Sequence, residues 1–144
     1  MSLENLLRIG QLKRHPPGAK EIERLLGAAQ RGIVDARIKE VSAETRFDAA
    51  YRAIMQIGLA ALMANGYRPE TSRPGSHMMT IQALTLTLDL NAKRMVVIDT
   101  LRRKRNLADY TGEDVDDESV AACIKEAEQL LLRARQRIEK IKLE

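Results

Sequence analysis

The feature that most constrains the fold is a periodic apolar pattern near the end of the chain, over residues 120–141. Its apolar residues recur at alternating spacings of four and three, and they are Val120, Ile124, Ala127, Leu131, Ala134, Ile138 and Ile141. That spacing places all seven on one face of a helix. Cations gather toward its end, where they complement the negative pole of a helix; they are Arg133, Arg135, Arg137, Lys140 and Lys142. A helix with so long an apolar face needs other helices to cover it, so the pattern predicts a bundle.

Five more helices, the first of them short, are predicted upstream. They are a short amphipathic helix near residues 3–9, a second from Ala19, a third from an N-cap at Ser42 to about Asn65, a fourth capped by Ser76, and a fifth over residues 92–112. Pro16, Pro17 and Gly18 separate the first two, and residues 67–75, with two prolines, are predicted to be a loop. The sequence thus predicts one all-α domain, residues 1–144, folded as an antiparallel up-and-down bundle of four to five helices. Residues 1–17 form its short N-terminal helix and linker.

Two details of this arrangement stay open. Threonines in the fourth segment could argue for a strand, but spacings of three and four favour a helix that is apolar on two sides. The turn around Asn91 is very short, so the fourth and fifth helices either pack antiparallel or continue as one kinked helix. Gly112 provides a stop for the fifth helix.

Composition excludes several classes of protein. Apolar residues make up 44% of the chain and charged residues 31%, which is neither a disordered nor a membrane composition. The N-terminus lacks a signal-peptide pattern, so a cytoplasmic location is expected. Cys123 is the single cysteine and is interpreted as a small core residue, and His15 and His77 lie far apart, so neither a metal site nor a cofactor is predicted. A net charge of +4 permits a nucleic-acid partner without requiring one.

The strongest candidate site lies at the end of the fifth helix. Arg105 falls on the apolar side, with Val97, Ile98, Leu101 and Ala108, and a cation there needs a partner. Asp109 is one turn later, at the spacing of a helical ion pair. Arg102 lies within about 60° of Arg105 around the helix, so both can face one groove and bind phosphate bidentately. The predicted ligand-binding residues are Arg102, Arg105, Asn106, Asp109 and Tyr110. The commoner explanation of such a charge run is a solvated helix end.

A second candidate surrounds the start of the fourth helix. Arg73 and the helix N-terminus could hold an anion beside His77. The favoured alternative is that His77 is half-buried and bonded to a backbone carbonyl. The acidic run at residues 113–118 is predicted to cap the last helix or to pair with the cations at 102–105.

The order of elements resembles the HEPN superfamily of small helical-bundle proteins. The resemblance rests on residues 47–67, on 75–84 (GSHMMTIQAL) and above all on 105–110 (RNLADY), and it covers the chain from the second helix onward. It implies a dimer with an arginine and a histidine in a cleft that cuts RNA without metal, often beside a nucleotidyltransferase in toxin–antitoxin pairs. Arg105 and Asn106 match the start of that motif, but Tyr110, Thr111 and Gly112 occupy the positions where the histidine would fall.

The resulting function prediction is a non-catalytic HEPN-type module. It would bind a nucleotide, RNA or a partner protein through an arginine-rich cleft, because a tyrosine of ordinary pKa is a poor base near neutral pH. The alternatives are a metal-independent ribonuclease that uses Arg105 with Tyr110 or His77, and a purely structural dimerisation bundle. A homodimer is expected because two rows of apolar residues extend beyond a single stripe; they are Met55, Leu59 and Met63, and Met79, Ala83 and Leu86. Core packing is expected for Met55, Met63, Met78 and Met79.

Overall fold

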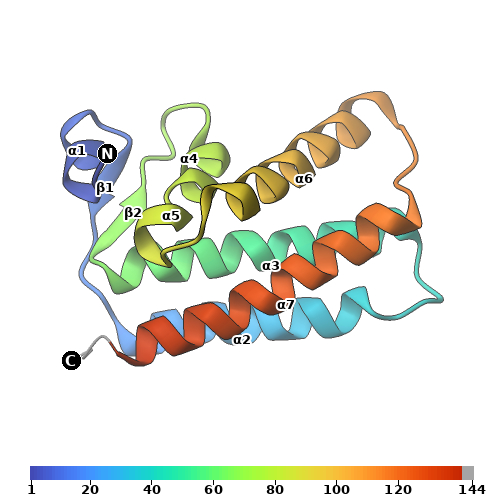
Figure 1. Cartoon of the computed structure of the whole chain (residues 1–144), viewed down its shortest axis with the longest axis horizontal. Coiled ribbons are helices and arrows are strands. Elements are labelled where there is room, and N and C mark those ends of the chain that lie inside the picture. The colour runs from blue at the N-terminus through green and yellow to red at the C-terminus, as the bar shows by residue number, and fades with distance from the viewer. Residues whose placement is uncertain (141–144) are drawn as a thin grey trace.

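The chain folds as a helical bundle, which confirms the predicted all-α class. The computed structural model describes residues 1–140, so Ile141 and Lys142 of the predicted last helix lie outside the described residues. The elements in order are α1 (Leu3–Arg8), β1 (Leu12–Arg14), α2 (Ala19–Ala36), α3 (Ala43–Ala64), β2 (Tyr67–Pro69), α4 (Ser76–Gln82), α5 (Leu84–Thr87), α6 (Ala92–Thr111) and α7 (Asp117–Glu139). The four long helices alternate in direction, with α2 and α6 running one way and α3 and α7 the other (Figure 1).

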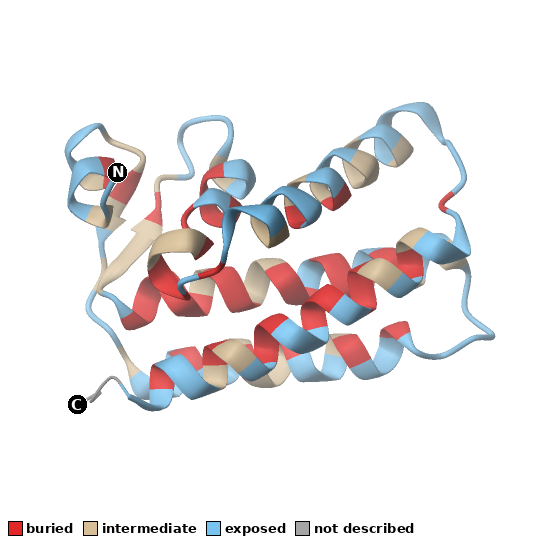
Figure 2. Cartoon of the chain, viewed as in Figure 1, coloured by how far each residue is buried: buried red, intermediate tan, exposed pale blue. Residues whose placement is uncertain are grey.

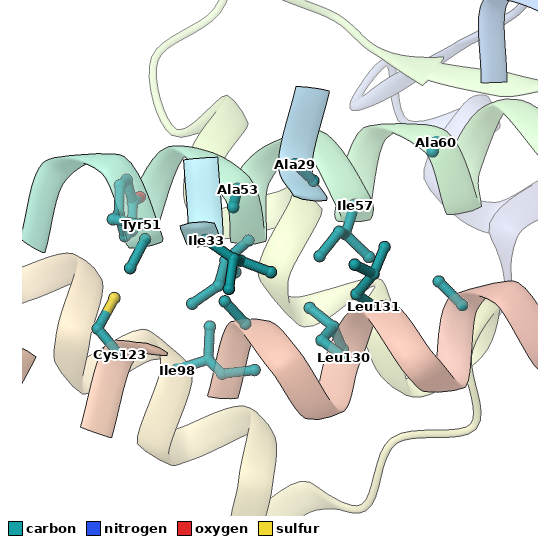
Figure 3. Close-up of a cluster of buried hydrophobic side chains, with 14 of the residues drawn as sticks. Ala29, Ile33, Tyr51, Ala53, Ile57, Ala60, Ile98, Cys123, Leu130 and Leu131 are labelled. Carbon is teal, nitrogen blue, oxygen red and sulfur yellow. The ribbon is translucent and has the colours of Figure 1, made fainter. Parts of the chain in front are cut away.

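Helix α3 is the centre of the bundle and packs extensively against α2 and α7. Small residues line its packing faces, among them Ala50, Ala53, Ala60 and Ala61, all almost fully buried. With side chains that short, neighbouring helices approach closely. Larger side chains fill the space between the helices, and Figure 3 shows Ile33 of α2, Ile57 of α3, Ile98 of α6 and Leu130 of α7 converging there. Beyond the first turn of α3, buried residues recur along the rest of the helix (Figure 2).

The predicted face of α7 is buried from Val120 to Ile138. Its residues pack mainly against α3, and also against α2 and α6. Cys123 is fully buried in the same core, as predicted, and burial raises the pKa of its thiol to about 12. A buried carboxylate, Glu126, lies beside this face and pairs with Arg94 of α6 at 3.0 Å.

Most helix boundaries follow from their caps, and those at Ser42, in the acidic run and at Gly112 are as the sequence predicts. The side chains of Ser42, Asn91 and Asp116 accept backbone hydrogen bonds at the starts of α3, α6 and α7. Gly112 ends α6 with a φ of 72°, in the left-handed region that suits glycine. Asp116 also pairs with Lys104 at 3.4 Å, so the acidic run both caps α7 and meets the cationic end of α6. The predicted cap at Ser76 is wrong, because Gly75, with a φ of 89°, is the N-cap and Ser76 is already helical.

The structure corrects the sequence prediction at two further elements. Residues 67–69, predicted as loop, form β2, which pairs antiparallel with β1 so that Leu12 lies opposite Pro69. Three-residue strands are too short to give a recognisable alternation, so only the pairing reveals them. The predicted fourth helix is broken near Ala83 into α4 and α5, and it is separate from α6.

Helix α6 is less buried than its apolar pattern indicates. Of the predicted inner residues, Ile98 and Leu101 are buried, but Val97 is 39% exposed and Ala108 is only partly covered. The far half of α6 projects along the edge of the bundle with most of its surface open (Figure 2). Met78, expected in the core, is also exposed, whereas Met63 and Met79 are buried and Met55 is partly buried against the core.

Candidate functional site

The site is built around Arg105, which reaches from α6 to the N-terminal half of α3. Its guanidinium carbon lies 5.0 Å from the centroid of the Tyr51 ring, a cation–π contact. Its Nε atom is 3.6 Å from Asp48 and 3.9 Å from Asp109, too far in both cases for a hydrogen bond. This Nε is buried and makes no hydrogen bond to the described residues. Arg105 is therefore held by a ring face and two nearby carboxylates, with unused hydrogen-bonding capacity.

Tyr51 links Arg105 to His77. The Tyr51 hydroxyl shares a hydrogen bond of 3.2 Å with Nδ1 of His77, which is brought in by α4. Burial raises the pKa of Tyr51 to about 12, so its hydroxyl is neutral at physiological pH. Partial burial lowers the pKa of His77 below its usual value, and the positive charges of Arg105 and Arg102 lower it further. The imidazole is thus largely neutral near pH 7.

Arg105, Tyr51 and His77 lie in the lining of a large groove with a volume of about 1110 Å³. Residues of α3 form one side, and residues of α2, α4 and β2 also line it. The apolar lining includes Leu25, Ala28, Met55, Leu59 and Met63, and five arginines, Arg24, Arg31, Arg52, Arg68 and Arg105, accompany three carboxylates, Glu21, Asp35 and Asp48. The groove therefore combines apolar surface with an excess of cationic side chains.

A small hollow of about 110 Å³ borders the other side of Arg105. Four carboxylates line it, from Glu44, Asp48, Asp109 and Glu113. Burial raises the pKa of Asp48, and the neighbouring Arg105 opposes that rise. An anion would be repelled from this acidic side, so access to Arg105 is favourable only from the groove.

The predicted site residues are only partly brought together. Arg105 shares the groove with His77 and the small hollow with Asp109. Arg102, expected beside Arg105 in one groove, lies outside both linings and donates from Nε to Asp99 at 2.8 Å. Arg73 donates to the carbonyl of Ile9 at 2.9 Å, which ties its loop to the N-terminal segment.

The other two predicted residues also lie outside the groove. Asn106 is partly exposed and Tyr110 is 89% exposed, and neither lines either hollow. The favoured interpretation of His77 predicted a hydrogen bond to a backbone carbonyl. That prediction is wrong, because His77 bonds to the hydroxyl of Tyr51.

Sequence reasoning missed Tyr51 and Asp48 as neighbours of Arg105. The apolar stripe of α3 places Tyr51 among core residues. Its hydroxyl was the available signal, because a buried tyrosine hydroxyl needs a polar partner. It also missed the arginines of α2 and α3, since the pattern of one helix does not reveal which groove its exposed face borders.

Within the described residues, no group of three or more histidine, cysteine or acidic side chains is placed to share a metal ion. Over residues 1–140, no helix has both the length and the apolarity that a bilayer crossing requires. Compared with known proteins, the sequence matches no protein-family model, and no curated protein is significantly similar to it.

Proposed function

We propose that this protein is a non-catalytic binding module that takes a phosphate-bearing ligand, a nucleotide or an RNA segment, at Arg105. The observation that carries the proposal is the state of that side chain: its guanidinium lies on the face of Tyr51 beside an open groove, and its buried Nε makes no hydrogen bond. Guanidinium groups bind phosphate oxygens through paired, charge-assisted hydrogen bonds. An anion in the groove would accept the hydrogen bonds that the Arg105 guanidinium leaves unused.

The surroundings of Arg105 favour binding over chemistry. Tyr51, the side chain in contact with Arg105, is a poor proton acceptor because its pKa is raised to about 12. Asp48 and Asp109 hold the arginine in place but also compete with an incoming phosphate. Affinity for a single phosphate is therefore expected to be modest and to fall with added salt.

Replacing Arg105 with alanine is expected to weaken binding of fluorescein-labelled ATP or of a labelled 15-nucleotide oligouridine. The expected loss is roughly ten- to a hundredfold, because a hydrogen bond to a charged group contributes about 1.5–3 kcal/mol. Fluorescence anisotropy at several salt concentrations gives the dissociation constant, and the salt slope should decrease by about one ion for the variant.

Arg137→Ala is the matched control, because Arg137 is a cation of α7 outside the groove lining. Equal affinities for the wild type, Arg105→Ala and Arg137→Ala would refute the proposal, as would the absence of any anion binding by the wild type. Circular dichroism of each variant verifies that the helices are retained.

A metal-independent ribonuclease is the second candidate, and one observation favours it. His77 and Arg105 contact the same tyrosine, and the lowered pKa of His77 leaves the imidazole neutral and able to accept a proton. This pairing would use His77 in place of Tyr110, which is 89% exposed and lines neither hollow.

The binding proposal predicts that the purified protein leaves RNA intact in the presence of EDTA. Gel analysis of a labelled RNA incubated with wild type, Arg105→Ala and His77→Gln measures this. Cleavage that survives repurification and disappears in both variants would replace the binding module with the ribonuclease.

The resemblance to HEPN proteins adds two partners to the proposal. One is a second copy of this chain, which would form a homodimer, and the other is a nucleotidyltransferase. Exposed apolar side chains on α6, including Val96, Val97 and Leu107, are the surface that would support self-association. Sedimentation velocity at micromolar concentration distinguishes the dimer from a monomer, and the purely structural bundle would dimerise without binding any anion.

A further inference from the structure

The groove extends well beyond Arg105, and its shape suits an elongated ligand. Lining residues of α3 run from Thr45 to Met63, which corresponds to about 27 Å of helix at 1.5 Å per residue. Along this length Met55 and Leu59 are partly exposed on one stripe of α3, with Leu25 and Ala28 of α2 among the other partly exposed apolar lining residues. Adaptable methionines beside leucines are typical of surfaces that bind helices.

The arginines along this groove differ from most others in the protein. Four of them make no side-chain hydrogen bond or ion pair with residues 1–140: Arg24, Arg31, Arg52 and Arg68. Arginines elsewhere on the surface are mostly engaged, as Arg37 is with Glu128, Arg135 with Glu23 and Arg133 with the carbonyls of Leu88 and Asp89. Among the arginines of residues 1–140, those without a partner are therefore concentrated along the apolar groove.

We infer that this groove is the docking site for an acidic amphipathic helix of a partner protein. Its apolar face would cover Leu25, Met55 and Leu59, and its flanking carboxylates would meet the unpaired arginines. The inference goes beyond the phosphate site at Arg105 and does not depend on it, because it uses the apolar length of the groove and the arginines of α2.

The apolar lining favours a protein helix over a nucleic acid as the occupant. Proteins that bind single-stranded nucleic acids commonly stack bases on aromatic rings. Tyr51 is the only phenylalanine, tyrosine or tryptophan side chain in the lining, and Arg105 already lies over its ring. A phosphodiester backbone would leave Met55 and Leu59 without apolar contacts, whereas a helix with one apolar face buries them.

The positions of two arginines specify the charge pattern of the partner helix. Arg24 and Arg31 are seven residues apart, which is about two turns and 10.5 Å along the same side of α2. Glutamate or aspartate at positions i and i+7 on one flank of the partner would face this pair. The apolar stripe beside that flank would repeat at spacings of three and four.

The experiment selects helices against the full-length protein. A displayed library of 18-residue peptides, with leucine fixed on one stripe and both flanks randomised, is enriched on the wild type alone. We expect acidic residues at i and i+7 to be enriched. The best peptide, synthesised with a fluorescent label, should bind Arg24→Glu/Arg31→Glu at least tenfold more weakly than wild type.

Three comparisons test the charge pairing and the apolar contacts of this site. Arg137→Glu, a reversal outside the groove, should leave peptide affinity within twofold of wild type. The peptide with lysine in place of its acidic residues should bind better to Arg24→Glu/Arg31→Glu than to wild type. Leu59→Asp should abolish binding of the acidic peptide, and thermal melts verify that each variant is folded.

Several results would overturn the inference. Enrichment without an acidic i, i+7 pattern would do so, as would peptide affinity unchanged by the Arg24 and Arg31 reversals. Tighter binding of the 15-nucleotide oligouridine than of every selected peptide, lost in Arg24→Glu/Arg31→Glu, would assign the groove to RNA. Loss of ATP binding in Arg105→Ala with peptide binding retained would support this inference and show that the peptide site is independent of the phosphate site.

Discussion

Replacing Leu131 with alanine is expected to lower the free energy of unfolding by about 2–5 kcal/mol, the range for a buried leucine that leaves a cavity. Leu131 lies on the face of α7 that packs against α3, in the same core cluster as Ile57 (Figure 3). Core side chains from α2, α3 and α6 also meet there, so the cavity cannot close without moving several helices. Chemical denaturation followed by circular dichroism measures the change.

The neighbouring residue provides the control for this prediction. Leu132 is on the same helix but is 61% exposed, so Leu132→Ala has the same effect on helix propensity and creates no cavity. Its cost should stay within about 0.5 kcal/mol. If Leu131→Ala cost as little as Leu132→Ala, the apolar face of α7 would be solvent-exposed and the described packing would be incorrect.

Arg94→Met is expected to destabilise the protein by about 2–3 kcal/mol, because it leaves Glu126 buried without its charged partner. The Arg94–Glu126 pair matters for α6 in particular, because this helix has few buried side chains to hold it against the bundle. Its buried residues are Ile98 and Leu101. The same denaturation experiment measures the loss, and Lys93→Met, an exposed neighbour, is the control.

A double variant tests whether the loss comes from the unpaired carboxylate. Arg94→Met/Glu126→Gln removes both charges and should regain much of the stability that Arg94→Met loses. Additive costs of the two single substitutions would mean that the two side chains do not interact, contrary to the contact observed between α6 and α7.

The regular parts of this fold could be predicted because they depend on local chemistry. The face of α7, the cap at Ser42 and the glycine stop at Gly112 each follow from residues within one or two turns of one another. The same reasoning placed Arg105 on the inner side of α6 and Asp109 within reach of it. It failed where a helix is only half covered, as for Val97, because an apolar residue can remain exposed at the edge of a bundle.

The partners of Arg105 on other helices were decided by tertiary structure alone. Periodicity gives the direction in which a side chain leaves its own helix, but it does not give the neighbour found there. Tyr51 and Asp48 come from α3, and His77 comes from α4 after the β2 strand has turned the chain. Arg102 leaves α6 close to Arg105 and is nevertheless paired with Asp99 outside the groove.

The sequence by itself therefore determined the four long helices, most of their ends and the position of one unusual arginine. The groove, its unpaired arginines and the link from Arg105 through Tyr51 to His77 depend on how α2, α3, α4 and α6 pack. Helix formation is encoded by neighbours along the chain, whereas a groove is the space left between elements that are distant in sequence. Its shape and charge are fixed only when their packing is fixed.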